Sequence, residues 1–433
     1  MYTCRPALLL WAAAVVAAAP LDVARVWSGH PVGFDLLTAG KRQYVAFYDD
    51  QRRMTVGVRG LEEREFRFVR LPSQLGWDSH NYVTMALDRQ GYLHVSGNMH
   101  VVPLVYFRST KPGDIDSLEQ VKEMVGSEEL RCTYPRFLRG AAGELLFTYR
   151  DGRSGSGNQI YNVYDEGARR WRRLLDRPLT DGEGKSNAYF ADPVLGPDGY
   201  FHLVWVWRNT PDCSTNHDLT YARSKDMAHW ETSGGKPLTL PIRVSSAEIV
   251  DPVPVEGGMI NGNTRIGFDS KKRPVITYHK FDGKGRTQIY NARLEGGTWK
   301  IYQASDWDYR WEFRGGGTIP FEIRVGAVRV EKGALLLDYS HDRYGSGVWR
   351  LDEATLRPVE TRAAAGEFPT EWMKAEREGM QVRVQRGKGD GRYVLRWETL
   401  GPNRDRPRAG EAPAPTMLRI YENGPSGRPE PGR

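Results

Sequence analysis

The stretch Gly196–Trp207, GPDGYFHLVWVW, joins a tight-turn sequence to an alternating run of β-branched and aromatic residues. Pro, Asp and Gly favour a turn, and the run after them is typical of a β-strand with at least one buried face. The same pattern, a turn with Gly or a polar pair followed by an apolar run, recurs along the chain. The other instances are AGKRQYVAFY from Ala39, DRQGYLHVSG from Asp88, GAAGELLFTY from Gly140, SKKRPVITYH from Ser270, EKGALLLDYS from Glu331 and GKGDGRYVLRW from Gly387.

A second strand-like run follows each of these instances. These runs are MTVGVR at Met54, LVYFR at Leu104, QIYNVY at Gln159, LTYAR at Leu219, QIYNAR at Gln288, GVWRL at Gly347 and LRIY at Leu418. The pairs number seven, at spacings of roughly 50 to 70 residues, which suits four-stranded propeller blades with their loops. A β-sandwich with an accessory sheet would explain the strands but not their recurrence. The sequence therefore predicts an all-β, seven-bladed β-propeller.

The predicted domain boundaries follow from this repeat. Residues 20–422 form one propeller, and Asp22–Trp27 supplies a strand that completes the last blade and closes the ring, which removes an exposed edge. The segment after about Gly401 is rich in Pro, Arg and Gly and is expected to be loop apart from the strand at Leu418. Residues 423–433 are predicted to be a disordered tail.

The amino-terminal residues 1–19 resemble a secretory signal peptide. Arg5 supplies a positive charge, and Leu8–Ala19 is a short apolar run that ends in small residues. This run is too short to span a bilayer comfortably, although an uncleaved anchor is the alternative. We therefore expect a secreted or periplasmic protein without stable membrane insertion. The mature chain would keep two cysteines, Cys132 and Cys213, which could form a disulfide bond but lack the spacing of a CxxC metal site.

Composition and net charge indicate which classes of binding partner the chain could have. The chain has 433 residues, 39% of them hydrophobic, which is ample for a packed core and excludes disorder along the whole chain. The net charge of +7 is spread along the sequence, whereas nucleic-acid binding needs basic residues clustered on one element. We therefore expect no nucleic-acid partner. The charge suits an acidic polysaccharide or oligosaccharide, and equally a solvated basic surface; the oligomeric state is left open.

The loops between strands carry the candidate site residues, because a propeller gathers its binding sites where blades converge. Gly76–Tyr82, GWDSHNY, and Gly97–His100, GNMH, each place a histidine next to or near an asparagine. His80 and His100 are the candidate catalytic histidines, and Asn81 beside His80 is a candidate substrate-binding residue. The strand and turn histidines His94, His202 and His229 are expected to be structural.

Further candidates lie at strand ends and in loops. They are Tyr134 in CTYPR, Arg150 at the end of LLFTYR, Tyr189 in SNAY, Arg208 at the end of HLVWVWR, and Arg314 before three glycines. Asn216, His217 and Asp218 form a polar triplet that could hold a structural Ca²⁺, or Zn²⁺ with Cys213 nearby. No cofactor is required for the chemistry considered below.

Several of these stretches together resemble a known family. GWDSHNY, SGNMHVVP, SNAY, HLVWVWR and TNHDLTYARSKD are similar to the secreted BNR-repeat-like propellers. That family includes ulvan lyases and L-rhamnose–glucuronate lyases and is related to α-L-rhamnosidases. In the lyases two histidines twenty residues apart, a tyrosine and an arginine form the site, and this pattern matches His80, His100, Tyr134 and Arg150. The resemblance implies that Tyr189, Arg208 and Arg314 bind substrate.

These residue types suit β-elimination from a uronic acid. Removal of the C5 proton needs a cation against the carboxylate to stabilise the enolate-like intermediate, a role that fits Arg150 and Arg208. An imidazole is largely neutral at neutral pH and can accept the proton, which makes His80 a candidate base. Tyr134 is the other candidate, either as a base whose pKa Arg150 lowers or as the donor to the departing oxygen.

Two alternatives stay open on the sequence. One is an exo-acting glycoside hydrolase similar to the α-L-rhamnosidases, for which His30 matches a histidine implicated on the opposite face of the propeller. The two carboxylates usual in glycosidases are not evident in the sequence. The other is a non-catalytic propeller that binds glycans through aromatic side chains.

Overall fold

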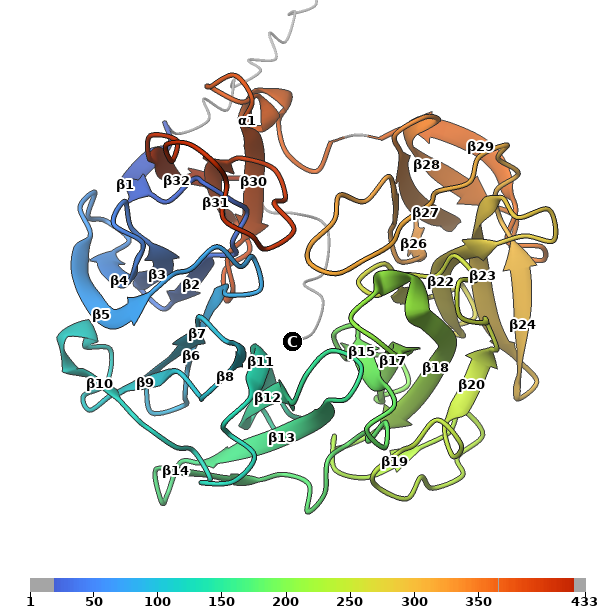
Figure 1. Cartoon of the computed structure of the whole chain (residues 1–433), viewed down its shortest axis with the longest axis horizontal. Coiled ribbons are helices and arrows are strands. Elements are labelled where there is room, and N and C mark those ends of the chain that lie inside the picture. The colour runs from blue at the N-terminus through green and yellow to red at the C-terminus, as the bar shows by residue number, and fades with distance from the viewer. Residues whose placement is uncertain (1–18, 365, 424–433) are drawn as a thin grey trace, which may run out of the picture.

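The structure is a computed structural model and describes residues 19–364 and 366–423. Its strands form seven β-sheets arranged around a common centre (Figure 1). The all-β, seven-bladed β-propeller is therefore the observed architecture. Helical structure in the described residues is limited to α1 (Thr370–Met373) and the 3₁₀-helices η1 (Ile115–Ser117) and η2 (Cys213–Thr215). The predicted signal segment, apart from Ala19, and the predicted tail after Asn423 lie outside the described residues.

The first four sheets follow one another along the chain, and their strands hydrogen-bond in the orders below. The first is β2 (Asp35–Ala39), β3 (Arg42–Tyr48), β4 (Arg53–Gly60) and β5 (Arg67–Gln74). The second is β6 (Val83–Leu87), β7 (Leu93–Gly97), β9 (Tyr106–Ser109) and β10 (Leu118–Gln120). The third is β8 (His100–Val102), β11 (Cys132–Arg139), β12 (Leu145–Asp151), β13 (Asn158–Asp165) and β14 (Arg170–Arg173). The fourth is β15 (Asn187–Phe190), β17 (Phe201–Arg208), β18 (Asn216–Ser224) and β19 (Trp230–Glu231), with β16 (Val194–Leu195) beside β17 and β20 (Glu248–Asp251) beside β18.

The remaining sheets complete the ring. The fifth is β21 (Arg265–Phe268), β22 (Pro274–Phe281), β23 (Thr287–Glu295) and β24 (Thr298–Gln303). The sixth is β25 (Ile323–Val325), β27 (Ala334–His341), β28 (Gly345–Leu351) and β29 (Pro358–Ala363), with β26 (Arg329–Glu331) beside β27. The seventh is β30 (Gln381–Arg386), β31 (Tyr393–Thr399), β32 (Thr416–Glu422) and β1 (Leu21–Val26).

The sequence repeat corresponds to the central hairpin of every sheet. The turn-plus-apolar runs form β3, β7, β12, β17, β22, β27 and β31, and the second runs form β4, β9, β13, β18, β23, β28 and β32. Each pair lies in the middle of its sheet. All eight residues of β17 are buried, which explains why HLVWVWR is apolar on both faces.

The ring is closed by pairing of the two ends of the chain. β1 pairs antiparallel with β32, in a register that runs from Leu21 opposite Ile420 to Val26 opposite Thr416. The predicted closure by Asp22–Trp27 is confirmed for the residues of β1, and Trp27 follows directly after it.

Hydrophobic layers between neighbouring sheets make up the core. The largest layer joins the seventh, first and second sheets, and others join the second to the third, the third to the fourth, the fourth to the fifth and the fifth to the sixth. Within the described ranges, no such cluster contains side chains of both the sixth and the seventh sheet. Polar loop contacts between Thr318 and Asp405 cross this seam instead.

Two of the histidines expected to be structural are buried in repeated surroundings. His94 Nδ1 lies 2.7 Å from the Tyr106 hydroxyl, and His202 Nδ1 lies 2.7 Å from the Tyr221 hydroxyl. Burial lowers the pKa of both imidazoles, so they are neutral packing residues. His229 is 90% exposed and hydrogen-bonds Asp226 in a surface turn.

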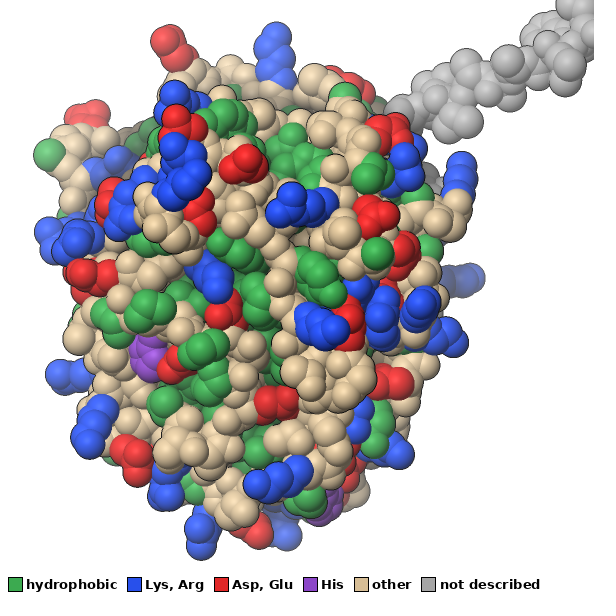
Figure 2. All heavy atoms as spheres, turned by 90° about the vertical axis from the view of Figure 1, so that its right-hand side faces the viewer, with side chains coloured by type: hydrophobic (Ala, Val, Ile, Leu, Met, Phe, Trp, Pro, Cys, Tyr) green, Lys and Arg blue, Asp and Glu red, His purple; other side chains and the backbone are tan. Residues whose placement is uncertain are grey.

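The surface charges are mixed in sign, and the two cysteines are buried. On the side formed by the fifth and sixth sheets, basic and acidic side chains are interspersed (Figure 2). Cys132 and Cys213 are both buried and unpaired, so the disulfide considered above is not formed. In the part of the chain that the structure describes, no helix has the length and apolarity needed to cross a membrane.

The closure makes a testable demand on stability. Val26 is fully buried at the end of β1, so Val26→Asp should lower the free energy of unfolding by about 3–5 kcal/mol, because it buries an unpaired carboxylate. Arg25→Asp introduces the same side chain at the exposed neighbouring position and should change the free energy by no more than about 0.5 kcal/mol. Chemical denaturation of both variants checks this, and equal losses would contradict the closure by β1.

Candidate functional site

A shared carboxylate orients the two candidate histidines. Asp78 Oδ1 accepts a hydrogen bond from the backbone N–H of His80 at 2.9 Å and lies 2.7 Å from its ring Nδ1. The other oxygen of Asp78 hydrogen-bonds Nδ1 of His100. The two imidazole centroids are therefore only 4.4 Å apart, although His80 lies in the loop before β6 and His100 begins β8.

This arrangement leaves the outer nitrogens of both rings available. Both Nδ1 atoms face Asp78, so each Nε2 points away from the carboxylate, and the two side chains remain 20% and 29% exposed. Burial alone would raise the pKa of Asp78, but hydrogen bonds from His100 and His80 outweigh it and hold the pKa well below its usual range. Asp78 is thus a carboxylate that fixes the histidines and does not donate a proton.

Tyr134 reaches the histidines through a distortion of β11. The register between β11 and β12 shifts between Thr133 and Arg136, and Tyr134 has a φ of 59°, which is unusual for a tyrosine. Its ring centroid lies 5.5 Å from that of His80 and 6.1 Å from that of Tyr189. The bulge therefore directs the side chain of Tyr134 towards the histidines. Strained backbone of this kind is common at functional sites.

Two arginines, Arg150 and Arg208, lie behind the tyrosines; we call them the arginine pair. Arg150 is 2% exposed, its carbon Cζ lies 5.0 Å from the Tyr134 ring centroid, and one of its N–H groups donates to the Tyr189 hydroxyl at 3.2 Å. Arg208 is 8% exposed and lies 5.3 Å from the Tyr189 centroid. Stacked aromatic rings fit the flat guanidinium groups of both.

The arginine pair lacks acidic partners. Arg208 donates to backbone carbonyls of Thr210 and Pro211 and to the side chain of Asn261, and Arg150 donates to Tyr189 and Thr133. Within the described residues no carboxylate forms an ion pair with either guanidinium, and Nε of Arg150 has no partner at all. Buried charges are normally paired, so the pair forms an uncompensated positive centre that suits an anionic ligand.

The two tyrosines differ in acidity. Burial, the largest effect, raises the pKa of Tyr134 well above its usual value, and the arginine pair does not offset it. Burial would also raise the pKa of Tyr189, but Arg150 and Arg208, with hydrogen bonds from Ser154 and Arg150, outweigh it and lower this pKa. Of the two roles left open for Tyr134, the raised pKa disfavours the base and favours the proton donor, because the direct hydrogen bond from Arg150 goes to Tyr189.

A buried carboxylate ties the site loops together. Asp405, in the loop between β31 and β32, has an 8% exposed side chain that accepts hydrogen bonds from the backbone and hydroxyl of Ser79 at 3.0 and 2.6 Å. It also accepts the backbone N–H of Thr318 at 2.7 Å, and its Oδ2 lies 3.4 Å from Nδ1 of His80. One side chain thus joins loops from three places in the sequence behind the histidine.

The remaining predicted residues lie around this group. Asn81 sits one position beyond His80, and its carbonyl accepts the Tyr48 hydroxyl at 2.6 Å. Arg314 is on the rim, 68% exposed, and pairs with Glu256 at 3.3 Å. His30 is fully buried, and its Nδ1 accepts the indole N–H of Trp27 at 3.0 Å. His30 also packs against Trp77, the neighbour of Asp78, and therefore lies behind the histidine site instead of forming a second one on the other face.

Metal-ligating atoms converge at a different place from the predicted triplet. His217 has its ring nitrogens 2.9 Å from Asp218 and 2.8 Å from Asn209, and the amide of Asn216 donates to the carbonyl of Cys213. A structural metal at this triplet stays a prediction. In the described part of the chain, Asp78, His80 and His100 are the cluster whose ligand atoms lie within 4.8 Å of one another.

Four residues of the site are not among those that the sequence predicts. Asp78 stood inside the quoted GWDSHNY stretch, and its position two residues before His80 was the available signal. Asp405 and Thr318 carried no such signal, because their contacts join segments far apart in sequence. Ser154, which lies 2.7 Å from the Tyr189 hydroxyl, was missed for the same reason.

Comparisons with known proteins agree with this description. Residues 42–307 match the BNR repeat-containing family. Among solved structures, the chain is similar to the polysaccharide lyase Uly1, with 14% identity and a TM-score of 0.59 over 94% of this chain and 99% of that one. It is also similar to an ulvan lyase of family PL25, with 12% identity and a TM-score of 0.57 over 93% and 95% of the two chains. No curated protein matches the sequence.

The role of Asp78 can be tested through stability. Because its pKa is depressed in the folded protein, the carboxylate stabilises the fold above about pH 4, and this contribution is lost as the pH falls below the unfolded-state value. Asp78→Asn should therefore lower the free energy of unfolding at pH 7 by about 1–3 kcal/mol and flatten its decline below pH 4. The exposed Asp50→Asn is the control; denaturation at several pH values that leaves both profiles unchanged would refute the role.

Proposed function

The chain belongs to the BNR repeat-containing family, and from this premise we propose that it is an exported polysaccharide lyase that cleaves a uronic-acid-containing glycan by β-elimination. The observation that carries the proposal is the juxtaposition of an uncompensated, buried arginine pair with an oriented imidazole and a protonated phenol. Each group supplies one requirement of the reaction.

The arginine pair would meet the substrate's negative charge. A uronate resists loss of its C5 proton while its carboxylate keeps its full charge, and nearby cations stabilise the enolate-like intermediate. Arg150 and Arg208 are already desolvated and held by uncharged partners, so neither has to break an ion pair to act. The Tyr189 hydroxyl accepts a hydrogen bond from Arg150, so we expect the substrate carboxylate to bind close to this hydroxyl.

His80 and Tyr134 would share the proton transfers. His80 receives the C5 proton on Nε2, since its Nδ1 is fixed on Asp78 and the imidazolium that forms is stabilised by that carboxylate. Tyr134 keeps its proton and donates it to the oxygen on C4 as that bond breaks. The C5–H and C4–O bonds break, a C4=C5 double bond forms, and His100 orients the group.

The similar solved structures support this class of substrate. The same ulvan lyase, at 12% identity and a TM-score of 0.56, is described in a structure bound to -[GlcA(1-4)Rha3S]-, a glycan that alternates a uronic acid with a sulfated rhamnose. A likeness at this identity concerns the fold. The substrate of the present chain is therefore argued from its own arginine pair and histidines, and an ulvan-like or rhamnose–glucuronate linkage is the proposed target.

The carboxylates near His80 favour elimination over hydrolysis. A glycosidase needs one carboxylic acid that donates a proton and one free carboxylate. Asp78 is held ionised by two imidazoles, and Asp405 is occupied by Ser79 and Thr318. His30 has no exposed surface from which to act.

The decisive experiment follows ultraviolet absorbance while the purified protein is incubated with ulvan, gum arabic and heparin-like glycans. Elimination creates an absorbing unsaturated uronate, hydrolysis yields only saturated sugars, and a binder yields neither. His80→Ala and Tyr134→Phe should each lower the rate about a hundredfold or more. The matched controls His229→Ala and Tyr344→Phe change exposed residues and should retain the wild-type rate. Near-wild-type turnover in both site variants would refute the assignment.

The side chain of Arg150 packs against Gly157, which has no side chain of its own. A Cβ at Gly157 would lie 2.6 Å from Cδ and 2.7 Å from Cγ of Arg150, so Gly157→Ala must displace the guanidinium. We expect the rate of elimination to fall roughly tenfold to a hundredfold because the charge is misplaced. Gly283→Ala, whose Cβ would meet open space, is the control and should have no effect. An unchanged rate for Gly157→Ala, with the thermal stability of both variants measured in parallel, would contradict a role for Arg150.

A further inference from the structure

We propose that the loop between β31 and β32 forms a second anion-binding subsite, which takes an additional anionic group of the same glycan chain. The inference rests on the proposed function, since the ligand is the acidic glycan whose uronate would face the arginine pair. It extends that function by requiring two negative charges on the substrate, held at two places.

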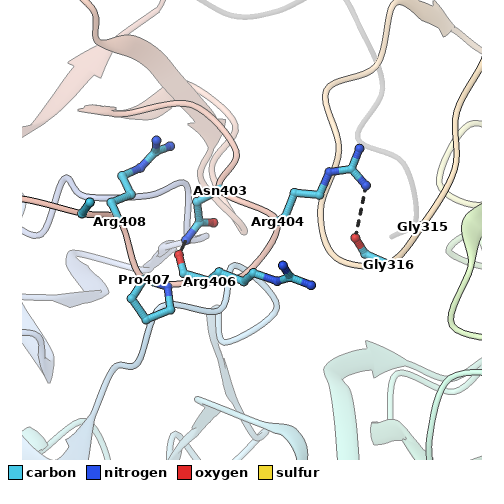
Figure 3. Close-up of a pocket in the computed structure, with 8 residues that line it drawn as sticks. Gly315, Gly316, Asn403, Arg404, Arg406, Pro407 and Arg408 are labelled. Carbon is cyan, nitrogen blue, oxygen red and sulfur yellow. Dashed lines mark hydrogen bonds between the residues drawn. The ribbon is translucent and has the colours of Figure 1, made fainter.

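A cavity of about 740 Å³ lies between this loop and the glycine-rich segment before β25. This volume falls in the range of roughly 300–1,000 Å³ that is typical of ligand pockets. The residues that line it are Gly315, Gly316, Asn403, Arg404, Arg406, Pro407, Arg408 and Ala409. Figure 3 shows Arg404 and Arg406 extending from the loop in the same direction, towards the Gly315–Gly316 segment.

The arginines of this loop have no acidic partners. Arg404 donates to the carbonyl of Arg314 at 2.9 Å, and Arg408 donates to the carbonyls of Gly29 and Gly401. Arg406 is exposed, and its guanidinium has no hydrogen-bond partner in the described structure. Across residues 19–364 and 366–423, none of the three forms an ion pair with a carboxylate. Interspersed charges, as on the side in Figure 2, would instead neutralise one another.

The one acidic residue of the loop is turned inward. The side chain of Asp405 is 8% exposed, and its oxygens accept hydrogen bonds from Ser79 and Thr318. It therefore anchors the loop from behind, and within the described residues it forms no ion pair with Arg404 or Arg406. The consequence is a concave surface with several guanidinium groups, which bind carboxylate or sulfate oxygens through two parallel hydrogen bonds.

The cavity shares its walls with the loops of the reaction site. The Asp405 anchor lies 3.4 Å from His80 Nδ1. On the other side, Gly315 accepts the backbone N–H of Cys213 at 2.8 Å and donates to Asp212, in the loop whose Pro211 carbonyl binds Arg208. A glycan that places one uronate against the arginine pair is thus led along these loops to Arg404 and Arg406. The group bound there is a sulfate ester or a second carboxylate.

Arg406→Gln gives the cleanest test because this side chain holds nothing else in place. Binding is measured by calorimetry in a His80→Ala background, so that the ligand is not consumed, with a sulfated rhamnose–glucuronate oligosaccharide and its desulfated form. We expect Arg406→Gln to weaken binding about tenfold. Arg172→Gln, which removes an exposed arginine on β14, is the matched control and should bind as the parent does.

The outcomes separate the two proposals. Weakening confined to the sulfated ligand identifies a sulfate ester, and equal weakening of both ligands identifies a second carboxylate; either supports the subsite. Unchanged affinity in Arg406→Gln, a loss equal to that of Arg172→Gln, or no binding of either ligand by the parent overturns it. Elimination is measured separately, with the protein that keeps His80. If that protein shows no elimination, while the His80→Ala parent still binds the oligosaccharide more tightly than Arg406→Gln does, the lyase proposal is refuted and the subsite proposal stands.

Discussion

Closure of the ring by β1 is the constraint on which the site depends. The antiparallel pairing of β1 with β32 fixes the seventh sheet beside the first, and the hydrophobic layer around Val26 joins them to the second. Only a closed ring brings the 401–410 loop over Ser79, where Asp405 accepts its hydrogen bonds. The same carboxylate binds Thr318 across the seam between the sixth and seventh sheets, where the described chain has no hydrophobic cluster. The Asp405 carboxylate therefore contributes both to closing the ring and to positioning the site loops.

The buried arginine pair has a cost for stability that its observed partners do not offset. Removing a guanidinium from water costs several kcal/mol, and an acidic partner usually offsets part of it. Arg150 and Arg208 have neutral partners and aromatic rings instead. The rest of the propeller has to support this uncompensated charge, and its rigid, layered core is suited to do so. A bound carboxylate would supply the missing partner.

Local chemistry explains why the fold could be predicted and much of the site could not. The turn-plus-strand repeats set every central hairpin because Gly, Asp and β-branched residues act within a few positions, and β31 was evident even among the basic residues near Gly387. His80 and His100 were found because each lies next to or near an asparagine in a polar stretch between strands, and the resemblance then assigned them a role. Asp405 lies 326 positions from Ser79, so only the folded ring brings the two together. The sequence left the role of Tyr134 open between base and proton donor, because the burial that raises its pKa against the neighbouring positive charges is not encoded in any local sequence pattern.

In the proposed reaction, the environment of each side chain, more than its residue type, decides its proton role. His80 and Tyr134 lie side by side, yet one is fixed on an ionised carboxylate and the other is desolvated with its proton retained. A carboxylate next to an imidazole stabilises the imidazolium that forms when the imidazole accepts a proton. Burial of a phenol disfavours the phenolate, so the phenol keeps its proton until the leaving group accepts it. Tyr189, whose pKa the arginines lower, would lose its proton more readily but lies beside the charge-binding groups. The proposed division into base, acid and charge-binding groups therefore rests on which side chain each residue faces.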